Sequence, residues 1–460
     1  MDNSLLAVRD INHKYIVVEG RNIIMFDKKI LLPHQYYYPH MDLFEDKSTV
    51  KKEEKFFTEL NSEVKPGDAS IYIHIPFCDS KCAFCGFDKV KNTTEIMQYK
   101  EKVIEEIHNY AEKEYIQHLT VSVIHIGGGT PTILPRDVFN DILNAAKENF
   151  NVSDNLIVNI EGSATTIYKD EVIDYIKENK ISKVSVGVQT FNQKLREQYK
   201  SKATLEEVYL TLSKLLDNDI TTGIDIMYGF PDFNIGNMLE ITFNDIKEAI
   251  RLGVDAIDFG QLYPYCNSLE KRIKEENLRF PTKNELLEII TTVNEMMERN
   301  GYEQKASYGY TKKNRDIRVM ESAYYGGIQN VPDCIAIGSG AFGFINGYKY
   351  RNNSYNAYIR GGRTRFSQLK KLTLNQLNNL NIVGFPKLLY LTKAQLEHNH
   401  GEKYMEKIQQ LISGVMLLET EVDYKVTEKG KCYIDNIYYF LLEEQEKNII
   451  DKQIRILSIQ

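Results

Sequence analysis

Short apolar runs alternate with longer segments of mixed polarity from residue 71 onward. The runs are rich in Ile and Val, as buried strands are, and span residues 71–75, 121–126, 156–160, 183–188, 222–227 and 256–262. The segments between them repeat apolar residues at helical spacing and span residues 96–114, 136–150, 170–178, 205–217, 237–252 and 283–300. Strands that alternate with helices predict an α/β fold with a parallel sheet and right-handed crossovers.

The pattern changes on both sides of this repeat. Residues 15–26 predict two short strands around a Gly-containing turn. Beyond about residue 350 the chain becomes rich in Asn, Lys and Leu, which indicates a separate part. We therefore predict an N-terminal extension over residues 1–66, a sheet domain over residues 67–348 and a C-terminal helical cap over residues 349–460.

Composition and charge narrow the class of protein. The chain is 42% hydrophobic and 26% charged, which is ordinary for a globular enzyme. Its net charge of -7, with no basic stripe, argues against a nucleic-acid partner. No apolar run approaches the roughly 18 residues of a membrane span, and the first residues lack the order of a signal peptide. We expect a cytoplasmic monomer with no membrane partner.

Three cysteines follow the first predicted strand within eight positions: Cys78, Cys82 and Cys85. Three thiols on one loop can ligate a single metal centre, because an irregular loop lets all the sulfurs point inward. Three is one ligand fewer than a closed zinc or iron–sulfur site needs, so one coordination position would stay open. The pattern predicts a catalytic centre whose fourth ligand is a cofactor or substrate.

Other roles for these cysteines stay open on the residues alone. A structural disulfide conflicts with the reduced thiols of the cytoplasm. A zinc site would need His74 or a distant cysteine as its fourth ligand, and the chain has no second Cys-x2-Cys pair. Unconnected buried cysteines would not explain spacing this dense.

The Cys-x3-Cys-x2-Cys spacing, with Tyr72-Ile-His-Ile-Pro-Phe-Cys before it, resembles the radical S-adenosylmethionine (SAM) superfamily. Within it the segment is similar to the oxygen-independent coproporphyrinogen III oxidase-like subfamily, which includes class C methyltransferases, anaerobic haem-degrading methyltransferases and haem chaperones. The resemblance covers about residues 70–345. It implies a partial (β/α)6 TIM-like barrel, a [4Fe–4S] cluster on the three cysteines and SAM on the open iron. Residues 426–440 further resemble the small winged-helix-like C-terminal domain of that subfamily.

The second predicted strand is followed directly by a glycine-rich segment that indicates a ligand-binding site. It consists of Gly127, Gly128, Gly129 and Thr130. Consecutive glycines let a backbone approach a ligand closely, although a tight turn would also require them. The resemblance implies that this segment meets the methionine part of SAM. It also adds Tyr72 to the cofactor contacts.

Polar residues at later strand ends extend this set. Glu161, Gln189 and Asp225 end the third, fourth and fifth predicted strands, where parallel barrels place their chemistry. The resemblance implies that Glu161 contacts the first SAM, and that Asp225 contacts the ribose of a second SAM or the substrate. Asp225 could instead cap a neighbouring loop. Two departures from the relatives lie after Glu161, where no proline follows, and near residues 199–202, where lysines replace an arginine.

The substrate side is less specific. The resemblance places Tyr263 and Phe342 near the bound cofactor or substrate. Cys266 and Tyr308 are weak candidates for chemistry, and Cys266 is explained as simply by burial.

One departure bears on the reaction. The coproporphyrinogen oxidases carry a further cysteine two residues beyond the third ligand, and Phe87 occupies that position here. The resemblance then favours radical methylation and oxygen-independent ring opening of haem, with two SAM molecules and an electron donor such as flavodoxin or ferredoxin. Coproporphyrinogen III oxidation, a haem-binding chaperone and a natural-product substrate are the alternatives.

Overall fold

A computed structural model describes the chain at residues 7–10, 13–18, 21–26, 38, 47–62, 66–79, 82–86, 90–91, 93–233, 236–262, 267–315 and 332–457. Packing divides it into two compact units. The barrel unit comprises residues 44–279 and 332–372, and the helical unit comprises residues 1–43, 280–331 and 373–460. The limits at residues 66 and 348 stay a prediction.

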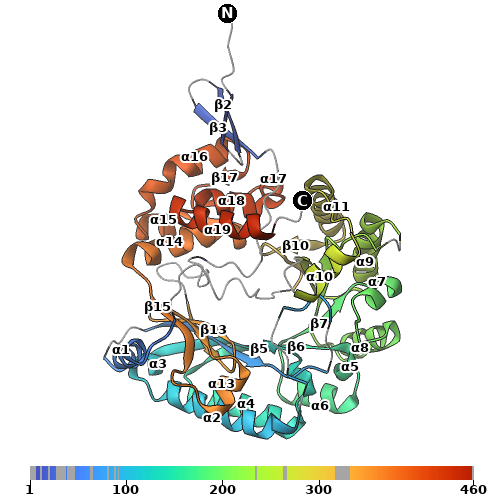
Figure 1. Cartoon of the computed structure of the whole chain (residues 1–460), viewed down its shortest axis with the longest axis vertical. Coiled ribbons are helices and arrows are strands. Elements are labelled where there is room, and N and C mark those ends of the chain that lie inside the picture. Colours follow the sequence, from blue (N-terminus) through green and yellow to red (C-terminus); the bar gives the residue numbers. More distant parts are fainter. Residues whose placement is uncertain are drawn as a thin grey trace, which may run out of the picture. The chain divides into compact units, whose positions relative to one another are not determined.

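A parallel sheet forms the centre of the barrel unit, in the order β9-β8-β7-β6-β5-β4-β12. Figure 1 labels β5, β6 and β7 of this sheet. These strands are β4 (Gly67–Ile75), β5 (Leu119–Gly128), β6 (Val152–Gly162), β7 (Lys183–Gln189), β8 (Thr222–Tyr228), β9 (Ala256–Gln261) and β12 (Asp333–Ile337). The predicted α/β fold with a parallel sheet is therefore confirmed. Among the described strands the order has two free ends, so the sheet is open, which is compatible with a partial barrel.

Strand β12 was not predicted. It pairs in parallel with β4, and all five of its residues are buried. The sheet continues beyond β12 as antiparallel strands β13 (Phe342–Ile345), β14 (Tyr348–Asn352) and β15 (Phe366–Lys371). The strand that carries the cysteine loop thus has a neighbour on each side.

Helices connect the parallel strands. They are α2 (Ile96–Ala111), α3 (Glu114–Gln117), α4 (Arg136–Asn149), α5 (Ala164–Ile167), α6 (Asp170–Glu178), α7 (Gln193–Gln198), α8 (Leu205–Asp217), α9 (Met238–Leu252) and α10 (Asn267–Glu275). Local sequence fixes several ends: Thr204 and Glu207 form a capping box before α8, and α9 stops at Gly253, whose φ is 71°. Helix α2 packs beside α4, and α4 beside α6 (Figure 1). Helices α1 (Val50–Leu60) and α13 (Tyr355–Arg360) complete the unit.

The helical unit contains two small antiparallel sheets, β1-β2-β3 and β16-β18-β17, and the β10-β11 hairpin. Their bounds are β1 (Ala7–Asp10), β2 (His13–Val18), β3 (Arg21–Met25), β10 (Tyr302–Gln304), β11 (Gly309–Lys312), β16 (Tyr390–Thr392), β17 (Leu417–Glu419) and β18 (Asp423–Val426). Its helices are α11 (Lys283–Arg299), α14 (Leu374–Gly384), α15 (Lys393–His398), α16 (Met405–Ser413), α17 (Glu428–Lys431), α18 (Ile434–Leu441) and α19 (Glu444–Leu457). The predicted strands around residue 20 are β2 and β3.

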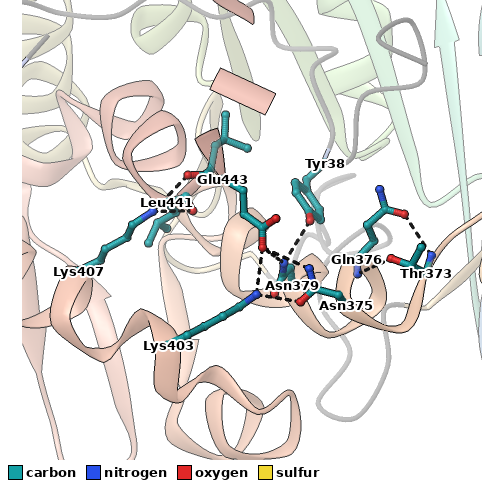
Figure 2. A network of polar contacts seen from close by, with 10 residues as sticks. Tyr38, Thr373, Asn375, Gln376, Asn379, Lys403, Lys407, Leu441 and Glu443 are labelled. Carbon is teal, nitrogen blue, oxygen red and sulfur yellow. Dashed lines mark hydrogen bonds and ion pairs between the residues drawn. The ribbon is translucent and has the colours of Figure 1, made fainter. Parts of the chain in front are cut away.

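A polar network ties the helices of this unit together (Figure 2). Glu443, just before α19, accepts hydrogen bonds from Lys403 at 3.0 Å and from Asn379 of α14 at 3.1 Å. Asn379 also donates to the Tyr38 hydroxyl at 3.3 Å. Lys407 of α16 donates to two carbonyl oxygens at the end of α18, where a cation complements the helix dipole (Figure 2). Among all described helices, none is both long and apolar enough to cross a membrane.

Candidate functional site

The cysteine loop leaves the carboxyl end of β4. Its first part is fixed by backbone hydrogen bonds, from Cys78 N to Val90 O at 3.1 Å and from Val90 N to Pro76 O at 3.0 Å. Cys78 is buried, whereas Cys82 and Cys85 are partly exposed. The loop position of Phe87 lies outside the described residues.

The thiols supply a donor set that fits an iron–sulfur cluster. The Thr130 hydroxyl lies 3.3 Å from Cys78 Sγ and donates to it, which is the kind of outer contact that tunes a thiolate ligand. Within the ranges that the structure describes, no three His, Cys, Asp or Glu side chains already converge on one point as metal ligands would. The three cysteines therefore stay the predicted ligands.

The glycine segment packs directly on the start of the cysteine loop. Gly129 N donates to Ile75 O at 2.7 Å, and Thr130 N donates to Phe77 O at 2.8 Å. A Cβ on Gly129 would lie 2.5 Å from Phe77 O, so only glycine fits this approach of two backbones. Gly128 has a φ of +116°, and its Cβ would meet the His74 ring at 2.6 Å. These glycines join the two loops, and their contact with SAM stays a prediction.

Glu161 is the carboxylate that faces this segment. Its Oε1 accepts from His125 Nε2 at 2.8 Å, and its Oε2 accepts from the Gly128 amide at 3.1 Å. Burial acts to raise the pKa of Glu161, but these hydrogen bonds and the charge of His125 outweigh it and hold the pKa below its ordinary value. The side chain is 41% exposed, so an ionised carboxylate keeps oxygen lone pairs for a ligand.

Strand register explains why these side chains meet. One row of side chains crosses β4, β5, β6 and β7 on one face of the sheet. Strand pairing aligns its members, which are Tyr72, His125, Asn159 and Lys183. The rings of Tyr72 and His125 stack at 5.8 Å, and the Tyr72 hydroxyl lies 3.0 Å from His74 Nδ1. We call this surface the polar face. The sequence analysis missed His125, although it alternates with Gly127 on the same strand.

Gln189 and Asp225 continue the polar face on β7 and β8. Gln189 ends β7 with a φ of 69°, at an irregularity that pairs Gly187 with Asp225 and Gln189 with Ile226. A left-handed backbone is unusual for glutamine, and it redirects this side chain at the strand end. Asp225 is paired with Asp258 of β9. The polar face thus carries Glu161, Gln189 and Asp225 from consecutive strands, although Asp225 lies within β8 and not at its end. Their contacts with SAM stay a prediction.

The predicted arginine position is filled differently. Lys202 forms an ion pair with Asp79 of the cysteine loop at 2.8 Å, so this lysine ties the loop to the segment after α7. The sequence analysis also missed Arg196, which is 3% exposed and donates to the carbonyl oxygens of Val188, Thr190 and Ala203. Arg196 therefore stabilises the turn beyond Gln189.

Four candidates remain. Phe342 begins β13 and is 43% exposed, with the Arg351 guanidinium 4.7 Å from its ring centre. Tyr308 belongs to the helical unit, where its hydroxyl donates to Asp435 at 3.5 Å. Tyr263 and Cys266 lie outside the described residues.

Comparison with known proteins identifies the type of domain. Residues 72–243 match the family model of the radical SAM superfamily. The chain is 26% identical over 400 residues to the heme chaperone HemW of Buchnera aphidicola subsp. Schizaphis graminum, covering 81% of this chain and 98% of that protein. It is 26% identical over 298 residues to the anaerobilin synthase of Escherichia coli O157:H7, covering 64% of each.

A solved structure shares the fold. Coproporphyrinogen III oxidase (HemN) from Escherichia coli, titled a radical SAM enzyme, matches with a TM-score of 0.70 at 20% identity and covers 86% of this chain and 96% of that chain. The cysteine loop and the polar face from Tyr72 to Asp225 both lie within residues 72–243, the range that matches the family model.

Proposed function

Because the chain carries a radical SAM domain, we propose that it is a radical SAM enzyme that acts on a tetrapyrrole, methylating haem and opening its ring without oxygen. One observation carries the proposal. The thiol of Cys78, the glycine segment and the Glu161 carboxylate meet at the carboxyl ends of three neighbouring parallel strands. Chemistry in parallel barrels lies at this end of the sheet.

The cysteines Cys78, Cys82 and Cys85 would hold a [4Fe–4S] cluster, and SAM would bind beside it. When bound, the cluster supplies the electron that cleaves SAM to methionine and a 5′-deoxyadenosyl radical. The glycine amides would meet the methionine part of SAM, and Glu161, already ionised, would accept hydrogen bonds from its ribose. Gln189 and Asp225 would serve a second SAM, and Tyr72 would line the first site.

The choice of methyl transfer rests on two supports. Phe87 offers neither a thiol nor a proton where the oxidases of the subfamily carry a cysteine. The anaerobilin synthase is matched over 64% of its length, which supports haem as the substrate. Oxygen-independent oxidation of coproporphyrinogen III is the alternative reaction, and the solved structure that shares the fold is named for it.

A non-enzymatic candidate has its own support. The heme chaperone HemW is matched over 98% of its length, which is more than the synthase is. In this alternative the chain would bind haem and keep its cluster without turnover. We further propose a cytoplasmic monomer that receives electrons from a flavodoxin or ferredoxin and binds neither nucleic acid nor membrane.

Product analysis separates these functions. The full chain, reconstituted with iron and sulfide without oxygen, is incubated with SAM, a reductant and either haem or coproporphyrinogen III, and the products are identified by mass spectrometry. A methylated, ring-opened product together with S-adenosylhomocysteine supports the proposal. Decarboxylation of coproporphyrinogen III would replace it with the oxidase. Haem binding without any product would replace it with the chaperone.

A further inference from the structure

The Lys183 side chain takes an unusual path over the polar face. Lys183 begins β7, yet its ammonium lies 3.6 Å from Asp258 Oδ2 on β9, two strands away. It crosses β8 at Gly223, where a Cβ would lie 2.6 Å from Lys183 Cε. The glycine at this position therefore makes room for the lysine stem. Lys183 is only 12% exposed, so the path is part of the packed structure and not a surface arrangement.

The Lys183–Asp258 ion pair lies beside Asp225. Asp225 and Asp258 are in register on the neighbouring parallel strands β8 and β9, so their side chains lie on the same face. Gly187, opposite Asp225 on β7, adds no side chain to this face, and the Gln189 amide lies over it: a Cβ on Gly187 would be 3.2 Å from Gln189 Nε2 and 3.9 Å from Asp225 Oδ2. Two carboxylates and one ammonium thus share a small area of the sheet.

A buried polar group lies beside the start of the Lys183 side chain. Asn159 of β6 is in register with Lys183 and is 7% exposed. Its Oδ1 has no hydrogen-bond partner among the residues that the structure describes. A buried amide oxygen without a partner costs stability unless something else donates to it.

We propose that Lys183 and Asp258 are positioning residues: Lys183 passes over Gly223 and holds the Asp258 carboxylate beside Asp225, so that Asp225 meets its ligand as a hydrogen-bond donor. The identity of that ligand, the ribose of a second SAM, rests on the proposed function. The arrangement of the three side chains does not.

The charges around Asp225 agree with this role. Burial, then the negative charges of Asp258 and Glu161, raise the pKa of Asp225 well above its ordinary value, and Lys183 alone opposes them. An ionised Asp225 could only accept hydrogen bonds, whereas a protonated one can donate to a hydroxyl or carboxylate oxygen.

The test reads the protonation of Asp225 directly, without SAM. Infrared difference spectra of the reconstituted full chain are recorded across pH, and the carbonyl band of a protonated carboxylic acid is assigned by its loss in Asp225→Asn. In Asp258→Asn the band should titrate about one to three pH units lower, because a like charge has gone. In Lys183→Met it should titrate higher, because the opposing positive charge of Lys183 has gone.

Two glycine variants form a matched pair. Gly223→Ala should shift the band in the same direction as Lys183→Met, because its Cβ displaces the lysine stem. Gly260→Ala, on the neighbouring strand β9, should leave it unchanged, because none of the residues that the structure describes comes within 4 Å of its Cβ. A band that is absent from the wild type at neutral pH, or that titrates alike in wild type, Asp258→Asn and Lys183→Met, would overturn the inference.

Failure of the proposed function would look different. A wild-type chain that never cleaves SAM would remove the ligand but leave the infrared titration intact. If SAM is cleaved while the infrared shifts are missing, the proposed function stands and the positioning role falls.

Discussion

Replacing Glu161 by alanine tests the candidate SAM site most directly. The carboxylate makes two hydrogen bonds within the protein, at 2.8 Å to His125 and at 3.1 Å to Gly128, and keeps a 41% exposed side chain for a ligand. A hydrogen bond to a charged group contributes about 1.5–3 kcal/mol. Losing one such bond to a ribose should weaken SAM binding roughly ten- to hundredfold.

The variant also changes the protein around the site. His125 is 5% exposed and would lose the acceptor of its Nε2, so part of the effect is a less ordered glycine segment. Glu161→Gln is the companion variant: its amide oxygen can still accept one of the two bonds, and it should lose less affinity than Glu161→Ala. Iron content and thermal unfolding of both variants show whether the chain stays folded.

Asp225→Ala is the matched comparison on the polar face. The assay measures SAM affinity by equilibrium dialysis without oxygen, then 5′-deoxyadenosine, S-adenosylhomocysteine and methylated product by mass spectrometry. Glu161→Ala should depress all three products together, whereas Asp225→Ala should depress methylated product and S-adenosylhomocysteine far more than 5′-deoxyadenosine. Equal loss of every product in both variants would refute this division of the two SAM sites.

Three further predictions use other parts of the barrel unit. The reconstituted chain should bind about four irons, and alanine at any one of the three loop cysteines should abolish this iron binding. Cys432→Ala should keep the iron. Zinc without iron in anaerobically purified protein would contradict the predicted cluster. Gly127→Ala places a Cβ 2.7 Å from Glu161 Oε1 and should weaken SAM binding while the iron stays. The control in equilibrium dialysis is Gly67→Ala at the start of β4, whose Cβ would make only an ordinary 3.6 Å contact with Leu119. Burial raises the pKa of Glu106 from 4.5 to about 7 although Tyr358, Gly338 and Asn352 donate to it, so the folded state binds the proton more tightly and stability should fall as pH rises from 4.5 to about 7. The free energy of unfolding should fall by roughly 3 kcal/mol, since the pKa differs by about 2.5 units and each unit corresponds to about 1.36 kcal/mol. Denaturant unfolding of Glu106→Gln should show no such fall. The same pH dependence in that variant would assign the effect to another group.

Local patterns were enough to predict much of the sheet. Ile/Val-rich apolar runs located the strands that became β4 to β9, and apolar residues at helical spacing located helices between them. Strand ends also predicted which side chains share the polar face, because parallel strands bring their carboxyl ends to one edge.

What the sequence could not predict depends on register and distance. His125 meets Glu161 only because β5 and β6 pair with a particular offset, and Lys183 reaches Asp258 only because Gly223 stands between them. Strand β12 was hidden because five buried residues beside a glycine run look like a loop until their partner is known. The roles of the cysteines and of the SAM contacts came from the resemblance, and they await the experiments above.

The pairing of β12 with β4 has a consequence for synthesis of the chain. Ala69 pairs with Asp333 and Ile73 with Ile337, so the strand before the cysteine loop receives its last neighbour after more than two hundred further residues have been made. Until then one edge of β4 offers unpaired backbone groups, which is where nascent sheets aggregate. Such distant pairing also slows folding, because a long loop must close before its contacts form. A ribosome-bound chain that stops short of residue 333 therefore holds all three cysteines on an unfinished edge, and assembly of a metal centre there belongs after release.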